Sequence, residues 1–186
     1  LYSTFKPRRL TAEELRDAML IASGELNREI GGLSARPDIN LEVARQPLQI
    51  MGGSASVYEP DPIPEQRNRR SLYAEKLRGL RDPFFETFNQ PGSTNSCEIR
   101  ETSTVAPQAL TLINSQEMHD RALAFAHRLS KETQDDKQVI KRAFQLALGR
   151  APTPKETLIF LEAWRTATSD ESPLSPKTSP LPNSIM

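Results

Sequence analysis

Proline positions most limit what this chain can fold into, because proline disrupts the interior of both helices and sheets. The 186-residue sequence has 15 prolines, and five of them lie between residues 33 and 68. Apolar residues in that stretch show no lasting periodicity, so we expect a long connection over 33–68. A connection of this length is uncommon inside a compact domain and is usually either functional or mobile.

The C-terminal end of the chain is also rich in proline. Four prolines and five serines fall within residues 169–186, where large apolar residues are few. Such a composition buries too little apolar surface to offset an ordering cost of ~1–2 kcal/mol per residue. We therefore expect 168–186 to be a disordered tail that is dispensable for stability. Residues 1–167 are expected to form a single helical domain.

Helix start and stop signals divide the rest of the chain. Thr11 and Glu14 have the spacing of a capping box, which predicts a helix over about 12–27. Asp82 before Pro83 predicts the start of a short helix whose three phenylalanines enter the core. Further signals predict helices that begin near 107, 116, 136 and 154. The fold class is mainly α, an irregular array of about five to seven helices with long Pro-rich loops and little or no sheet.

Charge and cysteine content limit the classes of function. Lys+Arg and Asp+Glu are both 24, and this balance argues against a nucleic-acid binder, which needs excess positive charge. No apolar run approaches ~18 residues, so the chain is expected to have no membrane span. The single cysteine excludes a C-x-x-C-H haem attachment, and His119 and His127 are about 12 Å apart along a helix. We expect no metal or haem in this chain.

A set of polar residues from separate segments is the main candidate for a site, and it has two interpretations. The preferred one is an ion-pair network in which Arg100 pairs with Glu13 or Asp17 of the first helix. The alternative is a ligand-binding or catalytic site. Cys97 is interpreted as a buried structural thiol, with a nucleophile as its alternative. This set, called here the polar seam, consists of Arg9, Glu13, Arg16, Asp17, Tyr73, Cys97, Arg100, Gln108 and Asn114.

Several of these residues also carry a family resemblance. The segments Arg8–Met19, Arg70–Tyr73, Pro83–Pro91, Ser96–Asn114 and Leu148–Glu156 follow one another as in a known bacterial family. Over about residues 1–165 the chain resembles the planctomycete-type domain of unknown function found beside planctomycete cytochrome c domains. Two departures are a missing helical segment upstream and a Ser/Pro tail in place of the apolar segment that usually ends the family domain.

The resemblance implies an exported, multidomain parent protein that is periplasmic or on the cell surface, with haem only in a separate domain. Its partners would be the other domains of that parent, including a cytochrome-c-like domain. On this basis we expect a structural or interaction domain. The alternative is an enzyme or ligand-binding domain, with carbohydrate as a candidate substrate class. The sequence leaves open whether the chain is an enzyme.

Overall fold

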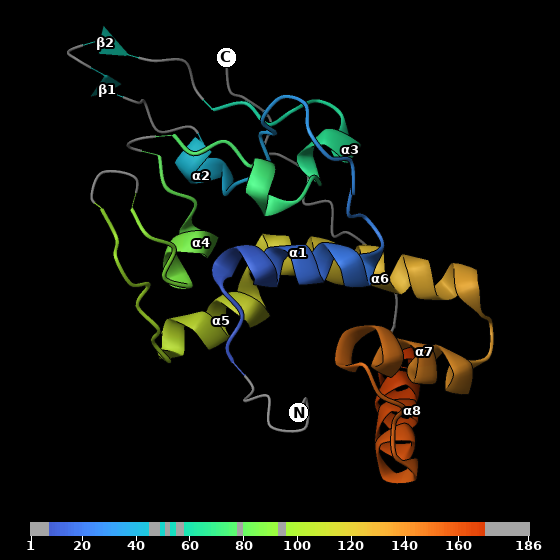
Figure 1. Ribbon diagram of the computed structural model, residues 1–186. Helices are drawn as coiled ribbons and strands as arrows, with labels where there is room; N and C mark the ends of the chain where they lie inside the picture. Colours follow the sequence, from blue (N-terminus) through green and yellow to red (C-terminus); the bar gives the residue numbers. More distant parts are fainter. Residues whose placement is uncertain are drawn as a thin grey trace, which may run out of the picture. The chain divides into compact units, whose positions relative to one another are not determined.

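The computed structural model of the chain describes residues 8–44, 49–50, 53–54, 58–77, 80–92 and 96–169. Helices dominate these residues (Figure 1), and the one sheet among them is the two-residue antiparallel pair β1 (Gln49–Ile50) and β2 (Gly53–Ser54). The expected mainly α fold with little sheet is confirmed. Most of the tail predicted over 168–186 lies outside the described residues.

The chain forms two compact units, Leu1–Arg128 and Leu129–Met186, and the end of one helix belongs to the second unit. Whether residues 1–167 fold as one domain stays a prediction. The first unit holds α1 (Ala12–Ser23), α2 (Leu41–Ala44), α3 (Pro64–Arg67), the 3-10 helix η2 (Ser71–Tyr73), α4 (Pro83–Thr87), α5 (Ala106–Asn114) and most of α6 (Gln116–Glu132). The second unit holds α7 (Asp136–Leu148) and α8 (Pro154–Ser169).

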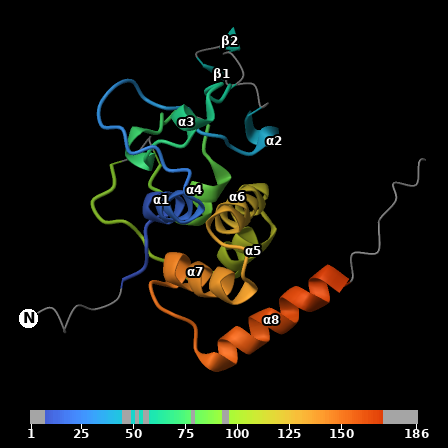
Figure 2. The same cartoon turned by 90° about the vertical axis from the view of Figure 1, so that its right-hand side faces the viewer.

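Helix α1 lies at the centre of the first unit in both views of the chain (Figures 1 and 2). It begins as predicted, because the Thr11 hydroxyl accepts from the Glu14 amide and the Glu14 carboxylate accepts from the Thr11 amide. It ends earlier than the expected residue 27, because Gly24 takes the left-handed conformation at φ 83°. Arg128 of α6 donates to carbonyls in the last turn of α1.

The core of the first unit forms where α1 packs on α4. Asp82 accepts a hydrogen bond from the Phe84 amide at 2.9 Å and Pro83 opens α4, as the sequence predicts. Phe84 and Phe85 are buried against Ala12, and Phe88 packs at their edge. The three phenylalanines therefore occupy the core, and they fix α4 against one side of α1.

One arginine orders the connection between α1 and η2. The buried Arg69 guanidinium donates to the carbonyls of Leu33 at 2.6 Å and Glu29 at 3.3 Å, and also to that of Gly31. It stacks on the Tyr73 ring at 4.2 Å, and the Tyr73 hydroxyl accepts from the Gly31 amide at 3.0 Å. Side-chain donors thus supply hydrogen bonds where the chain has no regular secondary structure.

The second unit is built on the packing of α7 against α8. Gly149 ends α7 at φ 68°, and Thr153 and Glu156 cap α8 at the start predicted near residue 154. Ile140, Phe144 and Leu161 form the buried cluster.

Helix α8 buries only part of the apolar face that helical spacing suggests. Leu158, Leu161 and Trp164 recur at three-residue intervals, but Leu158 is 68% exposed and Trp164 is 46% exposed. Phe160 instead packs edge-on against Phe144, with ring centroids 5.2 Å apart. Four consecutive residues of α8, 158–161, are apolar, so the sequence alone does not show which side of the helix faces α7. The ring contact between Phe144 and Phe160 determines that side.

Arg69 supplies the first test of this fold. Arg69→Met removes every guanidinium donor while keeping a stem of similar length. We expect the free energy of unfolding in urea to fall by about 3 kcal/mol, because each hydrogen bond to a charged donor contributes about 1.5–3 kcal/mol before the cost of burying the charge is subtracted. Arg70→Met is the matched control, because Arg70 is exposed. Equal losses in the two variants would contradict the role given to Arg69.

Candidate functional site

The polar seam does not form one site, and its first part is a cluster around Gln108. Arg9 donates to the Gln108 side-chain oxygen at 2.8 Å, to the Thr104 hydroxyl at 2.6 Å and to the Ser103 carbonyl. The buried Gln108 amide in turn donates to the Thr87 carbonyl at 3.0 Å. The cluster ties the segment before α5 to α4 and to the start of α1.

The second part of the seam is the ion pair between Glu13 and Arg100. The Arg100 guanidinium donates to both Glu13 oxygens, at 2.7 and 3.2 Å, which confirms the predicted pairing with α1. Burial alone would raise the pKa of Glu13, but hydrogen bonds from Arg100 and Gln90 outweigh it and lower that pKa to about 2. Arg100 is 43% exposed, so the pair is half-exposed to solvent and stabilises the fold less than a buried pair would.

The third part is Arg16 with Asp17. The buried Arg16 guanidinium donates to the Arg67 carbonyl at 2.8 Å, the Arg69 carbonyl at 3.0 Å and the Ser71 hydroxyl at 3.2 Å. The Asp17 carboxylate accepts from the Ser71 amide at 2.8 Å and from its hydroxyl at 2.7 Å. Arg16 and Asp17, which are neighbours on α1, therefore supply a donor and an acceptor to the same residue of η2, Ser71.

The remaining seam residues do not join these clusters. Tyr73 stacks on Arg69, away from the Glu13 pair, and Asn114 is exposed at the end of α5. Cys97 is exposed and its thiol donates to the Ile99 carbonyl at 3.2 Å, so the interpretation as a buried thiol is wrong. His119 and His127 are exposed on α6. Within the described residues no three His, Cys, Asp or Glu side chains are grouped to hold a metal ion.

A large cavity lies outside most of the seam. It has a volume of about 640 Å³ and is bordered by α1, α4, α5, α6 and residues 38–40 and 68. We call it the α1–α6 cavity, and it is large enough for a small organic ligand. Of the seam, only Arg16 lines it. The sequence analysis did not find that Glu117, Asp82 and Arg121 line one space, because they come from two segments with no shared motif.

The electrostatics of this cavity centre on Glu117. Burial raises the pKa of Glu117 to about 7, the Asp82 carboxylate adds to the rise, and Arg16 and Arg121 oppose it. Burial also raises the pKa of Asp82. Arg121 is held by Glu25 at 2.8 Å. A carboxyl that titrates near neutral pH inside a cavity is able to accept or donate a proton there.

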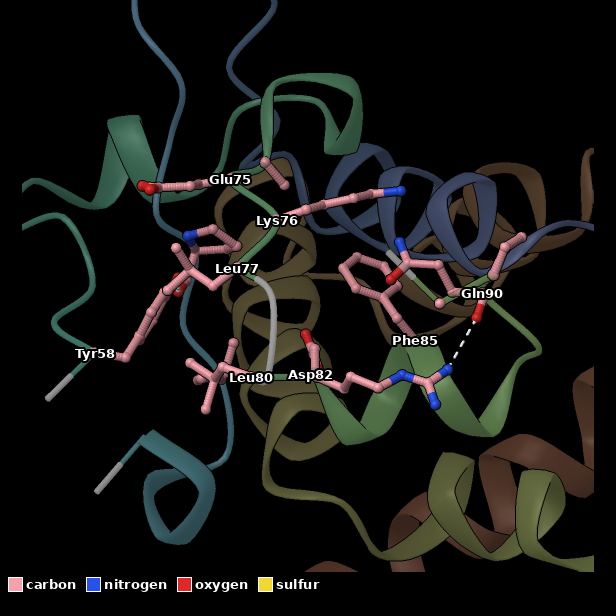
Figure 3. Close-up of a pocket in the computed structure, with 14 residues that line it drawn as sticks. Tyr58, Glu75, Lys76, Leu77, Leu80, Asp82, Phe85 and Gln90 are labelled. Atoms are coloured by element: carbon pink, nitrogen blue, oxygen red, sulfur yellow. Dashed lines mark hydrogen bonds between the residues drawn. The ribbon is translucent and has the colours of Figure 1, made fainter. Parts of the chain in front are cut away.

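A smaller apolar pocket adjoins the other side of Asp82. Its volume is about 60 Å³, which leaves room for only a few water molecules. Figure 3 shows Tyr58, Leu77 and Leu80 on one side of it and Phe85 across from them. The pocket is a gap between two apolar clusters, and it lacks the volume for a ligand.

These features define a helical domain in which ion pairs and arginine–carbonyl contacts hold irregular segments in place beside the α1–α6 cavity. A family model described as PSD1, protein of unknown function (DUF1553), matches residues 1–164, and the chain belongs to this family. No curated protein and no solved structure matches the chain significantly. Across the part of the chain that the structure describes, no helix is both long and apolar enough to cross a membrane.

The raised pKa of Glu117 predicts how stability changes with pH. This pKa is about 7 in the folded protein, against 4.5 for an unperturbed glutamate. The folded state therefore holds the proton more tightly, so the stabilisation is full below about pH 4.5 and is lost as the pH rises to about 7. At about 1.4 kcal/mol per pKa unit, we expect a loss of roughly 3 kcal/mol in the free energy of unfolding.

Urea denaturation across this pH range measures the effect of Glu117→Gln. The variant should lack the decrease between about pH 4.5 and 7, and should be more stable than the unmodified protein near pH 8. Glu162→Gln, on the exposed side of α8, is the control and should keep the decrease. The stability that the Glu13–Arg100 pair adds is lost at lower pH. Because the pKa of Glu13 is lowered to about 2, this loss falls between about pH 4.5 and pH 2. An identical decrease in the Glu117 variant would refute the assignment.

Proposed function

We propose that this chain is a structural and interaction domain of an exported, multidomain protein that also carries a cytochrome-c-like domain. The family resemblance of the sequence supports the export and the cytochrome association. The geometry of the polar seam supports a structural role, because its clustered charged side chains bond to one another or to backbone carbonyls. An enzyme built on the seam would need such groups to be open to a substrate.

The observation that carries the proposal is the orientation of α5. Its apolar residues Ala106, Ala109, Leu110 and Ile113 recur at i, i+3, i+4 and i+7 and so share one helix face. All four are exposed, with Leu110 at 56% and Ile113 at 67%, whereas Gln108 is the buried residue of the helix. Helix α5 thus turns its polar side to the core and its apolar side outward. An outward apolar helix face is typical of a surface that another domain covers.

Substitutions on this face test the proposal in the multidomain parent. Leu110→Ser with Ile113→Ser should leave the stability of this domain within about 0.5 kcal/mol, because both side chains are exposed. In the parent, the same change should loosen the contact with a neighbouring domain, seen as faster proteolysis between domains and a larger radius in small-angle scattering.

Ile30→Ser with Leu33→Ser is the matched control, because these residues are more exposed still and belong to the connection after α1. The control should leave the parent unchanged. If the α5 variant also leaves the parent unchanged, the face is not a domain contact. A loss of several kcal/mol in this domain alone would mean that the chain itself covers the face.

The proposal also holds that haem and metal reside in other domains of the parent. Cys97 is the one cysteine in the sequence, and the two histidines lie more than two turns apart on α6. We therefore expect the purified chain to show no Soret band in its visible spectrum and no stoichiometric metal in elemental analysis. A Soret band or one bound metal per chain would overturn this part of the proposal.

A further inference from the structure

The α1–α6 cavity has walls that carry charges of both signs. Glu117 and Arg121 are four residues apart on α6, so they lie one above the other on the same helix face. Arg16 enters from α1, and Asp82 enters from the start of α4. Asp38 and Asp120 line the cavity as well, so four carboxylates and two guanidinium groups border it.

The charged groups differ in whether the protein already satisfies them. Arg16 is fixed by its contacts with Arg67, Arg69 and Ser71, and Arg121 by its ion pair with Glu25. Arg16 and Arg121 act on the Glu117 carboxyl through their charge, but among the described residues none hydrogen-bonds to it or pairs with it at salt-bridge distance. A half-buried carboxyl that lines a cavity and lacks a protein partner is an acceptor available to a ligand.

Apolar side chains complete the cavity. Leu20 and Phe84 are both buried and line it together with Pro83 and Ile39. Asn40 and Asn68 add side-chain amides, each of which both donates and accepts hydrogen bonds. The space therefore offers apolar contact on some sides and mixed hydrogen-bonding groups on others.

We propose that the α1–α6 cavity binds a neutral polyhydroxylated ligand, such as a pyranose ring, and that Glu117 accepts hydrogen bonds from its hydroxyl groups. A hydroxyl donates to a carboxylate and accepts from an amide, so it fits a wall that carries carboxylates together with the Asn40 and Asn68 amides. The C–H faces of the ring pack on Leu20 and Phe84. An anion would be repelled by the four carboxylates of the wall, and a cation would be repelled by Arg16 and Arg121, so a neutral ligand meets no like charge.

The cavity volume fits this class of ligand. At about 640 Å³ it lies within the ~300–1,000 Å³ typical of small-molecule sites. This binding site goes beyond the interaction role proposed above, because it involves a different surface from the exposed face of α5. The two proposals can therefore fail independently.

Calorimetric titration of the whole chain with defined sugars tests the proposal. The neutral probes are glucose, galactose, mannose and xylose, with maltose and cellobiose as their chain-forming relatives. The charged probes are glucosamine and glucuronate. We expect at least one neutral probe to bind at millimolar concentrations or below, and each charged counterpart to bind about tenfold more weakly or not at all. If a disaccharide binds more tightly than the monosaccharides, the natural ligand is a glycan chain and not a free sugar.

Two variants locate the binding. Glu117→Gln keeps the shape of the side chain and should weaken binding about tenfold, because it loses a charged acceptor. Thr111→Phe on α5 fills the cavity from another wall and should abolish binding even if the first variant alters the fold. Glu162→Gln, outside the cavity, should bind as the unmodified chain does.

Three results would overturn the proposal. One is that the unmodified chain binds none of the neutral probes. Another is that it binds only a charged probe. The third is that both Glu117→Gln and Thr111→Phe bind the neutral sugar as tightly as the unmodified chain.

Discussion

The buried guanidinium of Arg16 is the interaction on which the first unit most depends. The segment that leads into η2 contains only the short helix α3 and an isolated bridge to Asn27, so the Arg67 and Arg69 carbonyls depend on a side-chain donor. Arg16 donates to two of these carbonyls and to the Ser71 hydroxyl, and Asp17 accepts from the Ser71 amide. Helix α1 is regular and capped, and it thereby holds in place a stretch of chain that forms only short helical turns.

The same guanidinium also shapes the α1–α6 cavity. Its position beside the carbonyls leaves a fixed positive charge in the wall, which opposes the rise in the pKa of Glu117. Burial lowers the pKa of Arg16 itself, but nearby carboxylates counteract this effect. Fold and cavity are therefore coupled through Arg16. Glu117 is the better target for mutation, because it lines the cavity without a protein partner.

Local signals in the sequence predicted the helix ends well. Thr11 and Asp82 act within a few residues of themselves, so the starts of α1 and α4 follow from the neighbouring sequence. The pairing of Arg100 with α1 was also predictable, because opposite charges on two distant segments narrowed the choice to Glu13 or Asp17.

Contacts with backbone carbonyls were not predictable in this way. Every residue carries a carbonyl, so nothing in the sequence indicated that Arg16 and Arg69 would bond to particular ones. The role of Glu117 was hidden for a related reason. Its pKa depends on burial by other segments, and the local sequence shows only a residue near a helix start.

Helix α5 shows how one polar contact determines the direction of an apolar face. Gln108 bonds to Arg9 and to the Thr87 carbonyl, and these contacts hold the Gln108 side of the helix inward. Leu110 and Ile113 then face outward, and full burial of such side chains contributes about 1.5–3 kcal/mol each. That gain is small against the ~4–15 kcal/mol cost of bringing two free molecules together. A domain tethered in the same polypeptide avoids most of that cost, so a face of this size is better suited to a contact within the parent protein than to a separate partner.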